Sequence, residues 1–79
     1  MENLKKYNNA FMECFDLPED KLNSDLVYMS VEQWDSVGHM QLVAMLEDAY
    51  DIMMDTEDIV DFSSYDKGKE ILGKYGVTF

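Results

Sequence analysis

A stretch in the middle of the chain, residues 34–53, carries the strongest structural signal in the sequence. Apolar residues recur there at steps of three and four, the spacing of one helix face. They are Val43, Leu46, Tyr50 and Met53, flanked by Leu42, Met45 and Ala49. Asp35 or Ser36 can cap this helix, because a short side-chain oxygen accepts an unpaired N–H of the first turn. We therefore predict a helix from about Ser36 to Tyr50. A serine then lies at the positive end of a helix dipole, where a phosphate group would be stabilised.

A second helix is predicted over about Glu2 to Phe15. Its apolar stripe is Leu4, Tyr7, Phe11, Cys14 and Phe15. Pro18 cannot continue this helix without the loss of a backbone hydrogen bond, so a long connection begins near Asp16. Because Cys14 lies on the stripe, we interpret it as a small buried hydrophobe, not a reactive thiol.

The connection from Asp16 to Asp35 is long for so small a chain, but it is rich in apolar residues. These are Leu17, Leu22, Leu26, Val27, Met29, Val31 and Trp34. We expect them to hold the connection against the helices, with a short helical turn around residues 19–22. Disorder is the wrong interpretation of such an apolar segment.

Two helices are predicted in the last third of the chain. Thr56 is a candidate N-cap for a short helix that reaches about Asp61. Ser63 or Ser64 caps the last helix, which we expect Gly76 to end. The inward stripe of that helix is Tyr65, Gly68, Ile71, Leu72 and Tyr75. A close contact with another helix would explain why a glycine stands at position 68.

These patterns predict an all-α fold, a small four-helix bundle of three main helices and one short helix. The 79 residues allow one core, so we expect a single domain over residues 1–79. No strong internal repeat is visible. The chain begins at a methionine and the pattern fills it, so we expect a freestanding protein and a monomer.

The charge of the chain is strongly negative. Six lysines and no arginine stand against seventeen acids, for a formal net charge of −11. Between Leu22 and Asp66 there are eleven acids and no lysine or arginine. Nucleic acid and anionic membranes are poor partners for such a chain, whereas basic protein surfaces are good ones. No apolar run has the length of a membrane span. One cysteine excludes an internal disulfide and favours a reducing cytoplasm.

One side of the central helix is predicted to face partners. Its residues share a strip with Ser36 at the head, and they have few large apolar groups. They are Val37, Gln41, Ala44, Glu47, Asp48 and Asp51. An acidic strip of this kind would attract a basic protein surface.

The triplet Asp35-Ser36-Val37 resembles the signature of the acyl and peptidyl carrier proteins. That signature is Asp-Ser-Leu, or a close variant, at the start of a helix that ends in an acidic run. Here the acidic end is residues 47–52, Glu-Asp-Ala-Tyr-Asp-Ile. The resemblance covers nearly the whole chain, since length, helix order and acidity also fit.

The resemblance implies a function and its site. In that family the serine hydroxyl carries 4′-phosphopantetheine, which a dedicated phosphopantetheinyl transferase takes from coenzyme A. Ser36 would be the attachment site, between Asp35 and Val37, and the chain a non-catalytic carrier of acyl or aminoacyl groups as thioesters. Its partners would be that transferase and the acyl-loading and acyl-transferring enzymes, through basic docking surfaces. In some relatives a pocket opens between the second and fourth helices, and its candidate lining here is Val43, Leu46, Ile59, Phe62 and Ile71.

Three departures from the fatty-acid pattern bear on the pathway. That pattern has leucine after the serine, then an acidic residue, and glutamate before the next leucine. Here Val37, Gly38 and Gln41 stand at those positions. The chain looks more like carriers of specialised pathways: polyketide, nonribosomal-peptide, D-alanyl-transfer or glycan-modifying.

Other kinds of site fit the sequence less well. A nucleophile elbow needs glycine at Trp34, and a base role for His39, three residues after Ser36, has no third group to orient the ring. A calcium loop from Asp51 would put Thr56 where glycine is required, so no metal site is predicted. The main alternative is an acidic helical adaptor that binds basic protein surfaces without covalent modification, with Ser36 only as a cap.

Overall fold

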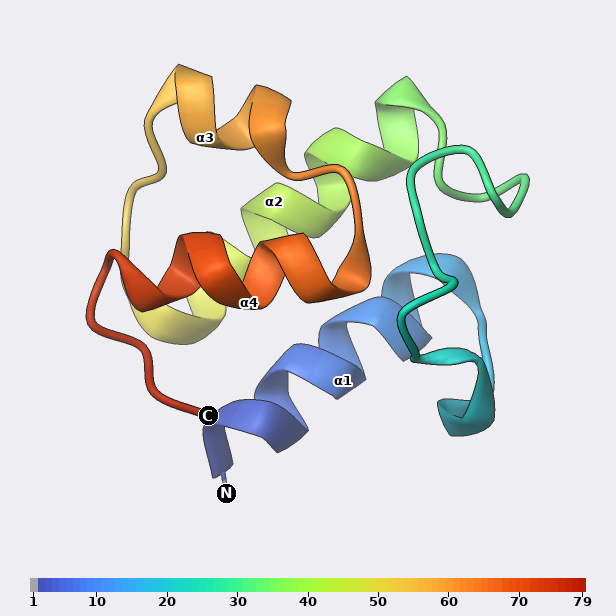
Figure 1. Cartoon of the computed structure of the whole chain (residues 1–79), viewed down its shortest axis with the longest axis horizontal. Coiled ribbons are helices and arrows are strands. Elements are labelled where there is room, and N and C mark those ends of the chain that lie inside the picture. Colours follow the sequence, from blue (N-terminus) through green and yellow to red (C-terminus); the bar gives the residue numbers. More distant parts are fainter. Residues whose placement is uncertain (1) are drawn as a thin grey trace.

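The computed structural model describes residues 2–79, which fold into an all-α bundle (Figure 1). There are three longer helices: α1 (Glu2–Phe15), α2 (Ser36–Tyr50) and α4 (Tyr65–Gly73). A short helix, α3 (Thr56–Asp61), lies between α2 and α4 along the chain. A single 3-10 turn, η1 (Glu19–Lys21), follows α1. The predicted fold class is confirmed, and the bounds of α1 and α2 are those expected from the spacing of their apolar residues.

The core is built around the aromatic rings of α1. Phe11 lies at its centre, with ring centroids of Tyr7 at 4.9 Å, Tyr65 at 5.3 Å and Trp34 at 5.4 Å. These pairs meet edge to face, the geometry that the charge distribution of aromatic rings favours. From α2, Leu42, Val43 and Leu46 complete this core. A small chain thus obtains a dense core from few, large side chains.

The central helix is shorter than its apolar pattern. Asp51 adopts a left-handed conformation (φ 53°), and its N–H bonds to the carbonyl of Glu47, so α2 ends at Tyr50. Met53 was expected on the inward stripe of this helix, which is wrong: its side chain is 85% exposed. After the turn, Met54 enters the core in its place.

The ends of the two last helices also differ from expectation. The N-cap of α3 is Asp55, not Thr56, which is the first helical residue. Ser64 caps α4, since its hydroxyl accepts the N–H of Lys67 at 2.9 Å. This helix ends at Gly73, three residues before the expected stop at Gly76, and a turn follows. Hydrogen bonds of the i to i+3 kind take over at this point, from the N–H of Lys74 onward.

The long connection is ordered by two buried residues and a set of backbone bonds. Leu26 and Trp34 are buried, and Leu17, Leu22 and Val31 pack against the core. Val27 and Met29 were expected to do the same, but both are exposed. Backbone bonds fix the connection to the start of α4: the N–H of Tyr28 donates to Ser63 and the N–H of Tyr65 to Leu26, both at 2.8 Å.

At Gly68, α4 packs closely against the rings of Tyr7 and Phe62. A Cβ at this position would lie 2.2 Å from the hydroxyl of Tyr7 and 2.3 Å from Cζ of Phe62. Both rings are buried, and the Tyr7 hydroxyl donates to the carbonyl of Tyr65 at 2.5 Å. A glycine is therefore required for packing here, despite its low helix propensity.

The variant Gly68→Ala should be less stable than the wild type by about 2 kcal/mol, because overpacking costs more than the gain in helix propensity returns. Gly73→Ala is the matched control on the same helix, since a Cβ there meets no atom within 4 Å. It should be neutral or stabilising by up to about 1 kcal/mol. Urea unfolding of the two variants measures the difference. Equal stabilities would contradict the packing role of Gly68.

Asp58 is a buried acid that joins α3 to the end of the chain. Its carboxylate accepts hydrogen bonds from the ammonium of Lys74 and from the hydroxyl of Tyr75. The Tyr75 hydroxyl also accepts the N–H of Asp55 at 2.9 Å. The hydrogen bonds from Lys74 and Tyr75 hold the pKa of Asp58 below its ordinary value. Both carboxylate oxygens of Asp58 thus have a hydrogen-bond partner, as buried polar groups require.

The lowered pKa of Asp58 predicts how stability depends on pH. The unfolded chain binds a proton at this carboxyl at higher pH than the folded chain, so Asp58 stabilises the fold above about pH 4, its ordinary pKa. This contribution is lost as the pH falls through the lower folded value. Asp58→Asn should be less stable than the wild type at pH 7, with a difference that shrinks toward pH 3. Glu70→Gln, at an exposed position of α4, should show no such trend in thermal melts from pH 7 to 3.

Candidate functional site

Ser36 is the first residue of α2, and its side chain is exposed. The helix is capped by the residue before it: a carboxylate oxygen of Asp35 accepts the N–H of Gly38 at 2.8 Å. Asp35 therefore meets the capping need of the first turn. The Ser36 hydroxyl is not the cap of this helix, and it lies at the surface, where another molecule can reach it.

Trp34 holds the segment that precedes Ser36. Its indole is fully buried, stacked on Phe15 at 5.4 Å between ring centroids and edge-on to Phe11. Its Nε1–H donates to Nδ1 of His39 at 3.0 Å. A large buried ring two residues before Ser36 fixes where α2 starts.

Gly38 lets the same segment lie directly on the first turn of α2. A Cβ at this position would be 2.0 Å from the carbonyl oxygen of Gln33 and 3.2 Å from the ring of Phe15. The thiol of Cys14 lies beside it and donates to the carbonyl of Gly38 at 3.6 Å. Burial raises the pKa of this thiol, which fits the expectation of an unreactive side chain, although Cys14 is only half-buried and not buried as expected.

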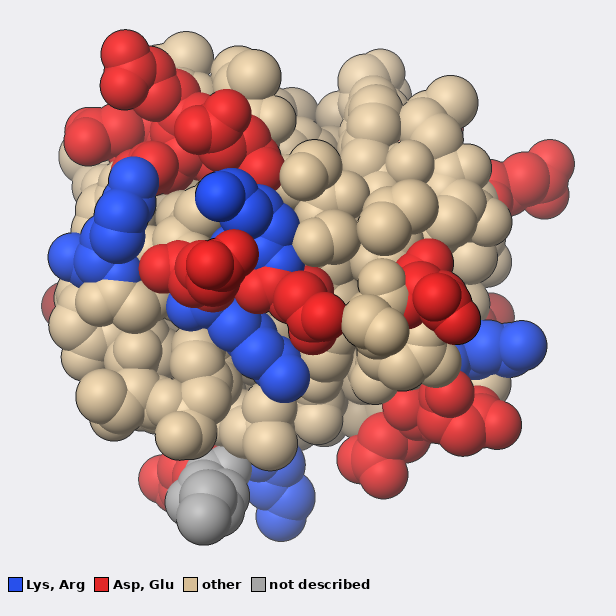
Figure 2. Space-filling view, in the orientation of Figure 1, with Lys and Arg blue, Asp and Glu red and all other residues tan. Residues whose placement is uncertain are grey.

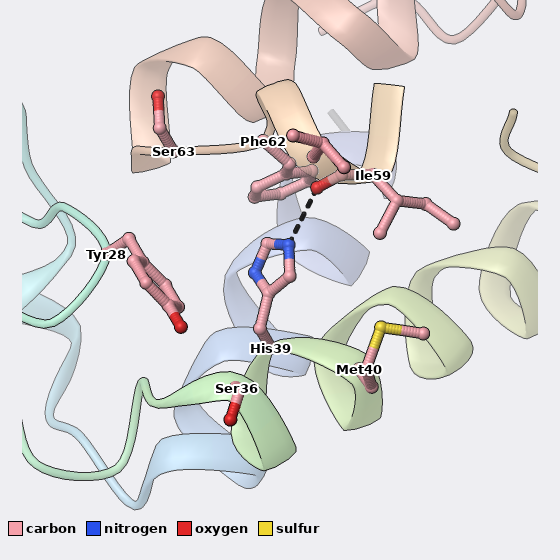
Figure 3. A pocket seen from close by; sticks show the side chains of 8 residues that line it. Tyr28, Ser36, His39, Met40, Ile59, Phe62 and Ser63 are labelled. Carbon is pink, nitrogen blue, oxygen red and sulfur yellow. Dashed lines mark hydrogen bonds between the residues drawn. The ribbon is translucent and has the colours of Figure 1, made fainter. Parts of the chain in front are cut away.

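A cavity of about 350 Å³ opens beside Ser36 (Figure 3). We call it the α2–α3 cleft, because it lies between the start of α2 and the end of α3. Its lining is mostly apolar or aromatic: Tyr28, Ser36, His39, Met40, Ile59, Val60, Phe62 and Ser63. Its volume is within the usual range for small-molecule pockets.

His39 crosses the cleft from α2 to α3. Its Nδ1 accepts from Trp34, and its Nε2 lies 2.8 Å from the carbonyl oxygen of Ile59, drawn as the dashed line in Figure 3. A carbonyl oxygen only accepts, so Nε2 carries the proton and the ring is the neutral tautomer. The one basic nitrogen is already engaged with the indole, and so His39 has no free lone pair with which to take a proton from Ser36.

The structure separates the predicted pocket residues into two groups. Ile59 and Phe62 line the α2–α3 cleft, on the same side as Ser36. Val43, Leu46 and Ile71 are buried in the closed core and do not line it. The cleft lies between α2 and α3, whereas the expected pocket lay between α2 and α4.

Several lining residues were missed by the sequence interpretation. Tyr28 comes from the long connection, Val60 from the outer side of α3, and Ser63 from the link to α4. Val60 is an exposed apolar residue, away from the inward side of its helix. That position was the available signal, because an apolar residue away from the core face can mark a binding surface.

The predicted partner strip lies at the surface of α2. Val37, Gln41, Ala44, Asp48 and Asp51 are exposed, and Val37 is 65% exposed. Glu47 is half-buried, and its Oε2 accepts the N–H of Met54 at 2.9 Å. Glu47 therefore also closes the turn after α2, a structural role that spacing alone does not reveal.

Charge is unevenly spread on the face that carries α4 (Figure 2). Acids gather over α3, lysines and acids are mixed along α4, and the area over residues 27–31 is largely uncharged. Among residues 2–79, no group of three or more acidic, histidine or cysteine side chains is placed to hold a metal ion. No helix formed by these residues is long and apolar enough to cross a bilayer.

The capping role of Asp35 can be tested by two substitutions. Asp35→Ala removes the acceptor for Gly38 and should destabilise the protein by about 1 kcal/mol. Asp35→Asn keeps an acceptor on a side chain of the same length. Its free energy of unfolding should lie within a few tenths of a kcal/mol of that of the wild type. Denaturant unfolding distinguishes them. If the alanine variant is as stable as the wild type, this hydrogen bond does not stabilise α2.

Comparison with known proteins gives no independent assignment of this site. No protein-family profile, curated protein or solved structure matches the chain.

Proposed function

We propose that the protein is a carrier that receives 4′-phosphopantetheine on Ser36. The observation that supports this most directly is the position of one hydroxyl. Ser36 is exposed at the start of α2 and lies at the rim of the apolar α2–α3 cleft. Its hydroxyl is not needed as the helix cap, because Asp35 serves as the cap. A hydroxyl that another enzyme must modify needs this accessibility, and a tethered apolar group needs a nearby surface on which to rest.

The start of α2 suits a phosphodiester on Ser36. The first N–H groups of a helix have no partner within the helix, and its N-terminus attracts negative charge. Asp35 accepts the N–H of Gly38, while the buried indole of Trp34 and the close approach at Gly38 fix the position of the turn. When bound, the arm would supply a terminal thiol that holds an acyl or aminoacyl group as a thioester. The chain's own residues present the arm, and they make and break no bonds of the cargo.

The α2–α3 cleft gives the arm an apolar surface beside its attachment point. Met40, Ile59 and Val60 line this cleft together with the ring of Phe62. Burial of apolar surface there would stabilise a docked state by about 25 cal/mol per Å². A carrier must release its cargo to the next enzyme, and a small open cleft fits weak, reversible shelter better than a deep pocket would.

The charge of the chain fits partners with basic surfaces. The formal net charge is −11, and Asp48 and Asp51 are exposed on the strip that Ser36 heads. These partners would be a phosphopantetheinyl transferase and enzymes that load and transfer acyl groups. The departures at Val37, Gly38 and Gln41 favour a specialised biosynthetic pathway, and the single cysteine favours a cytoplasmic setting.

The Ser36→Ala variant should gain no phosphopantetheine when incubated with coenzyme A and a transferase of broad specificity. Ser63→Ala is the matched control, because Ser63 lines the same cleft but lies outside a helix start. It should be modified like the wild type, with one added group per chain by intact mass spectrometry. Modification of Ser36→Ala would show that the site is wrong. A wild type that stays unmodified with several active transferases would favour the acidic adaptor.

The partner strip predicts how charge reversal affects the rate of modification. Asp48→Lys places a positive charge on the strip, so it should slow the transferase by roughly fivefold through loss of electrostatic attraction. Glu70→Lys makes the same change in net charge on α4 and should leave the rate nearly unchanged. Glu47 is less suitable because its carboxylate also bonds to Met54. Equal rates for both variants, with unchanged circular dichroism, would place docking elsewhere.

A further inference from the structure

The side chain of His39 is hydrogen-bonded to two parts of the chain that border the α2–α3 cleft, the connection before Ser36 and α3. On one side its Nδ1 accepts from the indole of Trp34, in the connection before Ser36. On the other its Nε2–H donates to the carbonyl of Ile59, in the last turn of α3. The last carbonyls of a helix lack partners within the helix, so His39 supplies one that α3 cannot make itself. The carrier proposal uses neither bond.

The two bonds respond differently to protonation of the ring. In the neutral ring, Nδ1 is an acceptor and Nε2 a donor. In the imidazolium both nitrogens are donors, so the bond to Ile59 persists and the indole N–H of Trp34 faces another N–H. The indole is fully buried, and its N–H then loses its partner. Imidazole in general changes charge between about pH 5 and 8, so this is the range of pH in which the exchange is to be tested.

We propose that His39 is a pH-sensitive positioning residue. When neutral, the imidazole links the segment before Ser36 to α3. When protonated, the imidazole releases this segment and remains bonded to α3. Trp34 stands two residues before Ser36, and Tyr28, which lines the cleft, packs on both the indole and the imidazole. Release therefore loosens the wall of the cleft and the start of α2 together. The proposal concerns the unmodified chain and holds whether or not Ser36 carries an arm.

Titratable groups near the imidazole could also contribute to a response to pH. Three rings surround it: Tyr28 at 5.5 Å, Phe62 at 5.8 Å and Trp34 at 6.3 Å between centroids. Tyr28 is the one titratable group among them. The other titratable groups on these elements are one base, Lys21, and acids or a phenol: Asp16, Glu19, Asp20, Asp25, Glu32 and Asp35 on the connection, Glu57, Asp58 and Asp61 on α3, and Glu47, Asp48 and Tyr50 on α2. Asp35 is bonded to Gly38 and Asp58 to Lys74, so both are already paired.

The chain contains one histidine and one tryptophan, which makes the link directly observable. Nuclear magnetic resonance of the unmodified full chain from pH 8 to 5 follows the imidazole carbons and the indole N–H in one sample. The indole resonance should shift with the same midpoint as the imidazole. Its protection from exchange, taken relative to the intrinsic exchange rate of a free indole at each pH, should fall by roughly fivefold or more, the ratio expected when one hydrogen bond is lost. The backbone amides of Tyr28 and Ser36 should shift with that midpoint.

The His39→Gln variant is the matched control, because glutamine has a donor and an acceptor but no charge change in this range. Its indole resonance should be independent of pH, which separates the link from general effects of acid. Two outcomes would overturn the proposal. One is an indole resonance that stays constant while His39 titrates, and the other is an imidazole that remains neutral down to pH 5. An equal pH response in His39→Gln would assign the effect to other groups.

Discussion

The indole of Trp34 lies where three parts of the molecule meet, and the site depends on its burial. Phe15 and Phe11 of α1 pack on its ring, Phe62 approaches it after α3, and His39 of α2 accepts its N–H. A fully buried ring of this size excludes water from a large apolar area, which is the main source of stability in so small a chain. Because Trp34 comes just before Asp35 and Ser36, the same burial that stabilises the core also sets the start of α2.

The short helix α3 is held in place by polar contacts at two points. With only six residues it cannot be stable by itself, since helix formation has a costly nucleus. On one side the carboxylate of Asp58 is bonded to Lys74 and Tyr75, and on the other the carbonyl of Ile59 is bonded to His39. Between them the ring of Phe62 enters the core. One wall of the cleft beside Ser36 is therefore fixed by hydrogen bonds to side chains of α2 and of the C-terminal segment.

The surface near Ser36 combines two kinds of interaction. Exposed acids on α2 suit a long-range attraction to basic surfaces, which mainly affects the rate of association. Three exposed apolar side chains lie near the start of α2 or at the cleft: Val37, Met40 and Val60. Close contact with another molecule would remove them from water. Attraction at a distance and apolar contact at short range can thus act in sequence at one place on the molecule.

The sequence alone determined the fold class and the two main helices, because both follow from local physics. The three- and four-residue spacing of Tyr7, Phe11 and Phe15, and of Val43 and Leu46, predicts helices whatever they pack against. The cap was predicted on the same grounds to be Asp35 or Ser36, and the structure selects Asp35. Ser36 was singled out by its neighbours along the chain, so its candidate role also needed no tertiary information. The expectation of a close contact at Gly68 came from its low helix propensity.

Only the tertiary structure decided where the cleft lies and which residues form it. Tyr28, His39 and Val60 come from three separate segments, and their distances depend on how α3 is held against α2. The exposure of Met53 depended on the left-handed turn at Asp51, and the second role of Glu47 on the path of the chain beyond that turn. Periodicity describes one element at a time, so it carries no information on how two elements meet. The neutral tautomer of His39, set by partners five residues before it and twenty after it, is the clearest example.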